Sequence, residues 1–424
     1  MRIAVISDCH LNDTTYSFVK DKVKTHLPFR TVDFMASFEY LVQKIIENKP
    51  NMLVIVGDAF DSAYPHSDVS AFFNEQMHLL QENKVHVIVL TGNHDISRQS
   101  NALKPLKSLS LPFIEIVDEP VAKKVGDYLY MLFPYSMDVE HRKISVRQQL
   151  DDFVKKTKVE IADKTLPDLP ILFFGHFGVQ GAVMSQSADK QPGITTENSI
   201  RRLSKNMIRG SDRDLVTVND LQNIGAKYIF LGDYHKHQIL SVPDSVAMYT
   251  GSIEKTDSGE MGIKKGCIIF DSEAKPDKKL GQCTFIEYPN CRPFVELRGN
   301  WHDIKEGCRG INDTHKGAVV KIHVVGTKIE VAECSSNLQR LKEWLVKKIA
   351  AVHILYEHTI VEEATPTALD EKGNPVAVVE PEFREGMERE VVRELIIEHV
   401  KDEPMQKLMT TIADELDTEF KGIK

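Results

Sequence analysis

The amino-acid sequence predicts an α/β fold, in which buried strands alternate with amphipathic helices. Met52–Val56 and Val87–Leu90 are uninterrupted apolar runs, which are typical of strands covered on both faces. Residues 31–48 and 67–83 carry apolar side chains at helical spacing and separate these runs. Each run is followed by a glycine and a possible metal ligand. In an open parallel sheet, ligands bind outside the carboxyl ends of the strands, so we expect a site at that edge.

The length of the chain limits the number of domains, and its charge distribution limits the possible partners. A chain of 424 residues exceeds one ordinary core and predicts two or three domains. The formal net charge is −9, but residues 361–424 hold 17 acidic against 8 basic side chains, which leaves 45 of each sign in residues 1–360. The acidity therefore belongs to the tail, and a DNA partner for the neutral body is not excluded.

Cysteine use and hydropathy indicate the compartment. The six cysteines form no C-x-x-C pair, and the first apolar run, Ile3–Ile6, is too short for a secretory signal. No run approaches the ~18 apolar residues that a membrane-spanning helix needs. We therefore expect a reduced, cytoplasmic protein without a membrane segment.

The first two strand ends supply an Asp-x-His pair and a lone carboxylate. On an extended backbone, Asp8 and His10 point to one side and Cys9 to the other, so the pair could chelate one ion. Asp58 follows the Met52–Val56 run directly, and our working hypothesis is that it bridges two metal ions. Asp61, three residues later, is either a turn carboxylate or a group near the substrate.

Three further strand ends continue the pattern. Asn93 offers a hard oxygen ligand, and the adjacent His94 faces elsewhere and is free to act on substrate. His176 follows the run 171–174. The last motif, Gly232-Asp-Tyr-His-Lys-His237, contains two overlapping pairs, Asp233-x-His235 and His235-x-His237, and either could place two donors on one side.

The ordered set is more informative than any single motif. It contains seven or eight oxygen and nitrogen donors and no thiolate, a mixture that suits a pair of manganese, iron or zinc ions, with manganese favoured. Two such ions bridged by a carboxylate can clamp a phosphoryl oxygen for in-line displacement. The set therefore predicts phosphoester hydrolysis.

The motifs resemble those of the calcineurin-like metallophosphoesterases. Within that superfamily, the sequence is similar to the SbcD-type nucleases of double-strand-break repair. The segments that carry this narrower resemblance are Gly57-Asp-Ala-Phe-Asp61, Thr91-Gly-Asn-His-Asp95, Tyr249-Thr-Gly-Ser-Ile-Glu-Lys255 with Lys264-Lys-Gly266, and Arg292-Pro-Phe-Val-Glu-Leu297. The implied fold is a sandwich of two mixed sheets flanked by helices.

The resemblance also implies roles for the site residues. One ion would be held by Asp8, His10, Asp58 and His235. The other would be held by Asp58, Asn93, His176 and Asp233. His94 would protonate the leaving oxygen or stabilise the transition state, and Asp61 falls near the scissile phosphate. The family normally has a histidine where this chain has Asp233; the alternative shifts the ligand pair to His235 and His237.

The remaining chain resembles the accessory parts of SbcD-type proteins. We expect a catalytic domain at 1–288, a small α+β DNA-capping domain at 289–363 with a helix at 336–352, a linker at 364–384 and a helical pair at 385–424. By resemblance, the helical pair docks on an SMC-like ATPase of the SbcC type, and the protein forms a homodimer.

Three functions follow from these patterns. The leading hypothesis is a metal-dependent DNA exonuclease or endonuclease that acts on DNA ends in repair or recombination, in a bacterial or phage-infected cell. The first alternative is a phosphodiesterase or phosphatase with a non-DNA substrate. The second, suggested by Asp233, is a scaffold subunit whose metal site has decayed.

Overall fold

The computed structural model describes residues 1–15, 27–109, 111–135, 144–183, 215–361, 368–369 and 375–376. The chain divides into two compact units, Met1–Thr359 and Ile360–Lys424. The predicted helical pair at 385–424 lies outside the described residues. Among the helices that are described, none has the length and apolar character to span a membrane.

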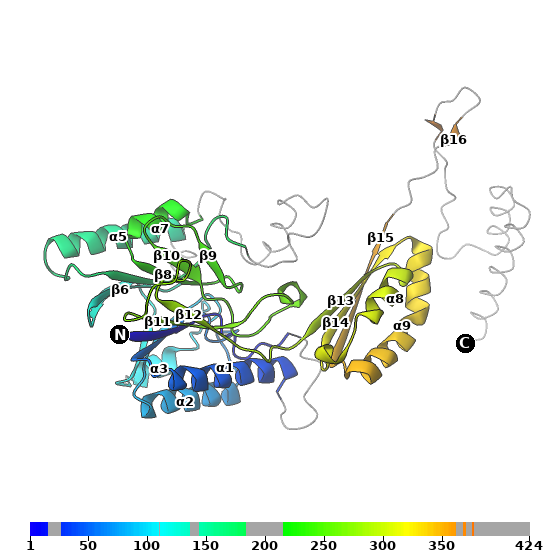
Figure 1. Ribbon diagram of the computed structural model, residues 1–424, viewed down its shortest axis with the longest axis horizontal. Helices are drawn as coiled ribbons and strands as arrows, with labels where there is room; N and C mark the ends of the chain where they lie inside the picture. The colour runs from blue at the N-terminus through cyan, green and yellow to red at the C-terminus, as the bar shows by residue number, and fades with distance from the viewer. Residues whose placement is uncertain are drawn as a thin grey trace, which may run out of the picture. The chain divides into compact units, whose positions relative to one another are not determined.

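The first unit is built around two six-stranded mixed sheets (Figure 1). The first sheet has the order β12-β11-β1-β2-β3-β4. Strands β1 to β4 run parallel, and β11 and β12 continue the sheet in antiparallel pairing. The strands are β1 (Arg2–Ile6), β2 (Met52–Val56), β3 (His86–Leu90), β4 (Ile114–Val117), β11 (Gly266–Asp271) and β12 (Cys283–Glu287).

The second sheet has the order β5-β6-β7-β8-β10-β9. Its four inner strands are parallel, and the two edge strands β5 and β9 are antiparallel to their neighbours. The strands are β5 (Val121–Val125), β6 (Tyr128–Phe133), β7 (Ile171–His176), β8 (Tyr228–Gly232), β9 (Gln238–Leu240) and β10 (Val246–Tyr249). The two mixed sheets confirm the predicted fold class.

Alternation along the strands produces the layers. In β2, Val54 and Val56 join the cluster between the sheets, where they share a core with Phe174 and Phe230 of the second sheet. Both faces of β2 are therefore covered, which explains why its sequence is a continuous apolar run.

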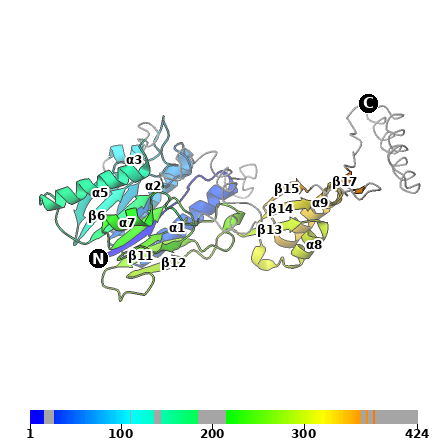
Figure 2. The same ribbon diagram turned by 90° about the horizontal axis from the view of Figure 1, so that it is seen from above.

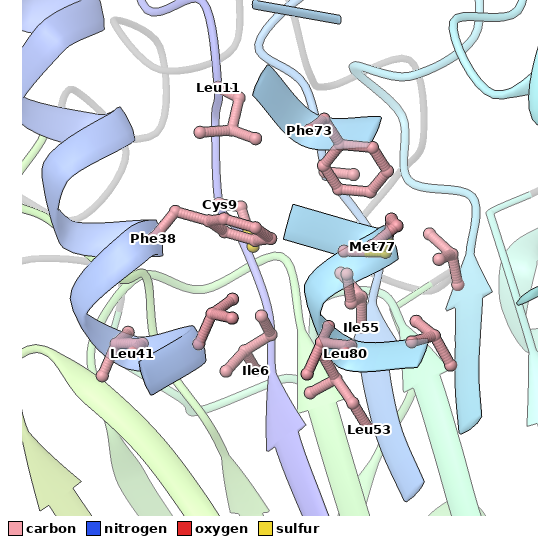
Figure 3. Packing of buried hydrophobic residues seen from close by; sticks show 14 of the residues in the cluster. Ile6, Cys9, Leu11, Phe38, Leu41, Leu53, Ile55, Phe73, Met77 and Leu80 are labelled. Atoms are coloured by element: carbon pink, nitrogen blue, oxygen red, sulfur yellow. The ribbon is translucent and has the colours of Figure 1, made fainter. Parts of the chain in front are cut away.

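Two pairs of helices close the outer faces of the sandwich (Figures 1 and 2). Helices α1 (Phe29–Glu47) and α2 (Ser67–Glu82) cover the first sheet, where Phe38 and Met77 share a cluster with Ile55 (Figure 3). Helices α5 (Val146–Ala162) and α7 (Val218–Ile224) cover the second sheet. The short helix α3 (Lys104–Leu109) and the single-turn η3 (Ser258–Glu260) complete this part.

A smaller three-stranded sheet, β13-β14-β15, follows in the chain. Helices α8 and α9 pack on it around a core of their own (Figure 2). The elements are β13 (Phe294–Gly299), α8 (Trp301–Arg309), η4 (Asp313–His315), β14 (Val319–Gly326), α9 (Lys328–Ile349) and β15 (His353–Ile360). Helix α9 begins eight residues before the predicted helix, because Thr327 and Glu330 form a capping box there.

A partly buried network of charged side chains joins the small sheet to the sandwich. Arg292, just before β13, forms a bidentate pair with Asp33 of α1 and donates to the carbonyl of Gly317 at 2.8 Å. Asp33 also accepts from the fully buried Arg30 at 2.6 Å. Bidentate arginine–carboxylate geometry fixes orientation as well as distance, so β13 starts from a defined position on α1.

The segment predicted to be a linker contains a short ladder. Strands β16 (Ala368–Leu369) and β17 (Pro375–Val376) pair antiparallel within the second unit. The boundaries of the linker and of the capping domain stay predictions.

Candidate metal centre

The side chains predicted as metal ligands follow strands of both sheets. Asp8 and His10 follow β1, Asp58 follows β2, and Asn93 follows β3. His176 ends β7, and Asp233 and His235 follow β8. The carboxyl ends of these parallel strands thus supply one site from two sheets, as the rule for open α/β sheets anticipates.

The backbone at these strand ends is left-handed. The prediction for Asp8 and His10 assumes an extended backbone, which the structure does not have there. The φ angles are 50° at Asp8, 41° at His10 and 50° at Asp58. Side chains of this kind tolerate φ > 0 at a cost, and such residues cluster at functional sites. Asp8 and His10 still face the site, while Cys9 lies in the hydrophobic cluster under α1 and α2 (Figure 3). The predicted directions are right although the assumed backbone is wrong.

Glycine is required where β2 ends. Gly57 has φ +81°, and a Cβ there would lie 2.1 Å from Nδ1 of His176. The backbone of one sheet thus touches an imidazole of the other, which only a residue without a side chain permits.

Two histidines face each other at the first part of the site. The Nε2 atoms of His10 and His235 are 3.1 Å apart. Nδ1 of His10 donates to Asp61 at 3.0 Å, and Nδ1 of His235 donates to Glu260 at 3.1 Å. With both Nδ1 protons directed at carboxylates, both Nε2 atoms present lone pairs to the same point. Lone pairs repel at that distance unless a cation or a proton lies between them.

A second convergence surrounds His176. Its Nδ1 donates to the carbonyl of Val56 at 2.8 Å, so Nε2 again presents a lone pair. That atom lies 3.0 Å from Oδ1 of Asn93 and 3.3 Å from Oδ2 of Asp58. With a neutral ring, three acceptor atoms therefore face one another, and either a proton on Nε2 or a bound cation must lie between them.

The electrostatics agree with this geometry. Burial by itself would lower the pKa of His176, but the charge of Asp58 and their hydrogen bond raise it to about 10. Burial would likewise raise the pKa of Asp58, but His176 holds the pKa of that carboxyl well below its usual range. Without a cation the site therefore holds protons, and a cation must displace them to bind.

The donor atoms form three overlapping groups, each within 4.8 Å. Asp58 belongs to two of them and Asp8 belongs to two. The groups are Asp8, His10 and His235; His10, Asp58 and His94; and Asp8, Asp58 and His176. The donor set of carboxylates, imidazoles and an amide fits one or two hard or borderline divalent ions.

Asp233 and His237 lie in different surroundings. Asp233 donates its backbone N–H to Oδ1 of Asp8 at 2.9 Å. Burial raises the pKa of its carboxyl to about 6, with Asp8 and Asp58 acting in the same direction against the positive charge of His176. His237 instead donates to the carbonyl of Tyr249 at 2.8 Å and stacks on Phe285 with the ring centroids 4.5 Å apart. The His237 ring therefore contacts Tyr249 and Phe285, and it belongs to none of the three groups of candidate metal ligands.

His94 and Asp61 lie at the exposed edge of the site. The His94 side chain is 41% exposed, and its Nδ1 donates to the carbonyl of Asp61 at 3.0 Å. Its backbone N–H donates to Oδ1 of Asp58 at 2.9 Å. Asp61 thus holds His94 through its carbonyl and His10 through its carboxylate.

Sequence reasoning missed several residues that support the site. Asp95 accepts backbone N–H groups from Phe60 at 2.9 Å and Gly92 at 2.8 Å, which ties two ligand loops together. Glu260 and Lys265 form a buried pair behind His235. The Gly-Asn-His-Asp motif contains Asp95, but no spacing in the sequence indicates that Glu260 reaches a histidine 25 residues earlier.

A family model described as calcineurin-like phosphoesterase matches residues 1–237, and the chain belongs to this family.

Curated relatives extend the likeness beyond that domain. The chain is 21% identical to the SbcD component of the nuclease SbcCD of Staphylococcus epidermidis, over 75% of this chain and 78% of that protein. It is 22% identical to the DNA double-strand break repair protein Mre11 of Archaeoglobus fulgidus, over 94% of this chain and 84% of that protein.

Gly57→Ala tests the close approach of the two sheets. We expect it to abolish tight binding of divalent metal ions and to lower the free energy of unfolding, because the added Cβ meets the His176 ring. The overpacking should cost about 1–3 kcal/mol beyond the strain of placing alanine at φ > 0. Titration calorimetry and urea unfolding measure the two effects.

Gly225→Ala is the matched control. Gly225 has φ +75°, similar to Gly57, but a Cβ there would meet nothing within 4 Å. The Gly225→Ala variant should share the conformational cost of alanine at φ > 0 and leave the binding of divalent metal ions intact. Equal losses in the two variants would mean that the contact with His176 is unimportant.

Proposed function

We propose that this protein is a metal-dependent nuclease that hydrolyses phosphodiester bonds at DNA ends, in repair or recombination. One observation carries the proposal: the ring nitrogens of His10, His235 and His176 converge on one another or on the oxygens of Asn93 and Asp58, so that a proton or a cation must lie between them. Family membership supports phosphoester hydrolysis, and the SbcD and Mre11 relatives support DNA as the substrate.

Two divalent ions fit this donor set, and we propose manganese. One ion would be held by Asp8, His10, Asp58 and His235, and the other by Asp58, Asn93, His176 and Asp233. When bound, such ions stabilise charge on phosphoryl oxygens and make a water molecule acidic enough to act as nucleophile at neutral pH.

The chain's own residues supply the proton chemistry. His94 reaches the exposed edge of the site with its Nδ1 held by the Asp61 carbonyl. In its imidazolium form, with a proton on each ring nitrogen, His94 can deliver the Nε2 proton to the leaving oxygen or donate it in a hydrogen bond as charge develops there. Asp61 orients His94 and also places a carboxylate beside His10.

The partners are proposed from resemblance and from the relatives. We propose that residues 385–424 dock on an SMC-like ATPase of the SbcC type, that the protein is a homodimer, and that it works in the cytoplasm. The small sheet β13-β14-β15 is the proposed DNA-capping domain.

A phosphodiesterase or phosphatase with another substrate would use the same centre, so substrate comparison is the decisive experiment. We expect manganese-dependent cleavage of linear duplex DNA that exceeds hydrolysis of a nitrophenyl phosphodiester and stops when the metal is chelated. Absence of DNA cleavage by the purified chain, alone and with its ATPase, would contradict the proposal. Fewer than about one manganese ion per chain at saturation would favour the scaffold alternative.

His94→Ala should separate catalysis from metal binding. We expect DNA cleavage to fall about 10²–10⁴-fold, the usual contribution of a general acid, with manganese stoichiometry unchanged. Because His94 also falls in a donor group with His10 and Asp58, loss of a bound ion would show that His94 is a ligand instead.

Truncation after about residue 380 tests the partner proposal. The shortened chain should no longer bind the ATPase in a pull-down of the two purified proteins, while its own manganese-dependent cleavage persists. Binding that survives the truncation would place the docking surface elsewhere in the chain.

A further inference from the structure

A buried ion pair stands directly behind one of the histidines of the metal centre. Glu260, at the end of η3, and Lys265, just before β11, are 3% and 0% exposed at their side chains. Their charged atoms, Oε2 of Glu260 and Nζ of Lys265, are 2.8 Å apart. Burying such a pair is expensive unless further hydrogen bonds satisfy it, so its surroundings indicate what it does.

The hydrogen-bond partners of the pair are His235 itself and two residues of the segment that follows β10. Oε1 of Glu260 accepts from Nδ1 of His235 at 3.1 Å, and Oε2 accepts from the backbone N–H of Thr256 at 2.8 Å. Lys265 donates to the carbonyl of His235 at 2.8 Å and to the hydroxyl of Ser252 at 2.7 Å. The pair therefore holds His235 at two points, the ring through Glu260 and the main chain through Lys265.

The charges within the pair favour this arrangement. Lys265 places its ammonium group 2.8 Å from Oε2 of Glu260, and this positive charge favours the carboxylate form. Glu260 therefore faces His235 as an anionic acceptor. An imidazole that donates to an anionic carboxylate is fixed in one tautomer and becomes a stronger ligand through its other nitrogen.

We propose that Glu260 is a positioning residue that fixes the ring and the Nδ1–H tautomer of His235, and that Lys265 holds Glu260 in place. Nε2 of His235 then faces His10 at 3.1 Å with its lone pair available to a cation. This inference rests on the proposed metal-dependent function.

The proposal predicts an effect on one ion only. His235 shares a donor group with Asp8 and His10, whereas His176 belongs to a separate group with Asp8 and Asp58. The Nδ1 of His176 is held by the carbonyl of Val56, not by Glu260. Weakening Glu260 should therefore affect the ion that His235 holds and spare the ion that His176 holds.

Glu260→Gln in the full chain is the test, with Mn²⁺ alone as the probe. Glutamine keeps the shape of glutamate but lacks its charge, and its amide can present an N–H to His235. We expect calorimetry to show one of two Mn²⁺ binding events weakened about 10–100-fold, the usual effect of losing such a support, with the other within about 2-fold.

Glu287→Gln is the matched control. Glu287 pairs with Lys264, the neighbour of Lys265, at 2.5 Å, but its side chain is 43% exposed and it does not contact His235. We expect this variant to bind both ions as the unaltered chain does.

A second variant guards against misfolding. Glu260→Gln alone leaves the Lys265 charge buried without its partner, which destabilises a fold strongly. Glu260→Gln combined with Lys265→Met removes both charges, and the melting temperature in the presence of a chelator shows whether each chain is folded. The double variant should show the same selective loss of one ion.

The measurements distinguish a failure of the positioning role of Glu260 from a failure of the proposed nuclease function. Unchanged affinity for both ions in the two variants, or equal weakening of both ions, would overturn the positioning role. If the unaltered chain binds two ions but does not cleave DNA, the proposed substrate is wrong and the role of Glu260 is still judged by binding. If the unaltered chain binds fewer than two ions, the two-metal function and this inference fail together.

Discussion

The acceptor atoms at one edge of the sandwich repel one another, and the surrounding structure must hold them close together despite this repulsion. Asp8 and Asp58 are buried carboxylates, and the imidazoles of His10, His235 and His176 present their lone pairs toward them or toward each other. Without a cation, protons reduce this repulsion, and the charge of Asp58 accordingly raises the pKa of His176. The arrangement is costly as a purely structural feature, and it is what a cation site requires.

Much of the surrounding fold serves to hold these atoms against that repulsion. Asp95 ties the loops after β2 and β3, and the Val56 carbonyl fixes His176 from the facing sheet. The left-handed backbone at Asp8 and Asp58 persists because strands of both sheets constrain it. Rigid strands on two sheets place ligands more precisely than mobile loops could, which suits a reaction that depends on electrostatic stabilisation.

The sequence predicts the strands that carry the site better than it predicts the contacts of the individual side chains. The run Met52–Val56 identifies a doubly covered strand because both of its faces are apolar, and the structure covers both. The spacing at the end of β8 left two interpretations open, because alternation makes Asp233 and His237 equivalent relative to His235. Tertiary packing decides where each side chain lies: His237 stacks on Phe285, which is 48 residues away in the chain, and neither Asp233 nor His237 belongs to one of the three donor groups. The assignment of Asp233 as a ligand stays a prediction. Glu260 escaped prediction for a similar reason: a three-residue turn has no periodicity that shows where its carboxylate points.

The segment from Gly251 to Glu260 links the metal centre to the small sheet. At one end Glu260 holds the His235 ring, and Ser252 accepts from Lys265. Between them, Glu254 accepts the backbone N–H of Arg292 at 3.1 Å, and Arg292 is the residue that pairs with Asp33 and leads into β13. The orientation of a metal-facing histidine and the attachment of the small sheet therefore depend on the same ten residues. A change in the contacts between Glu254 and Arg292 therefore also acts on the segment that holds His235.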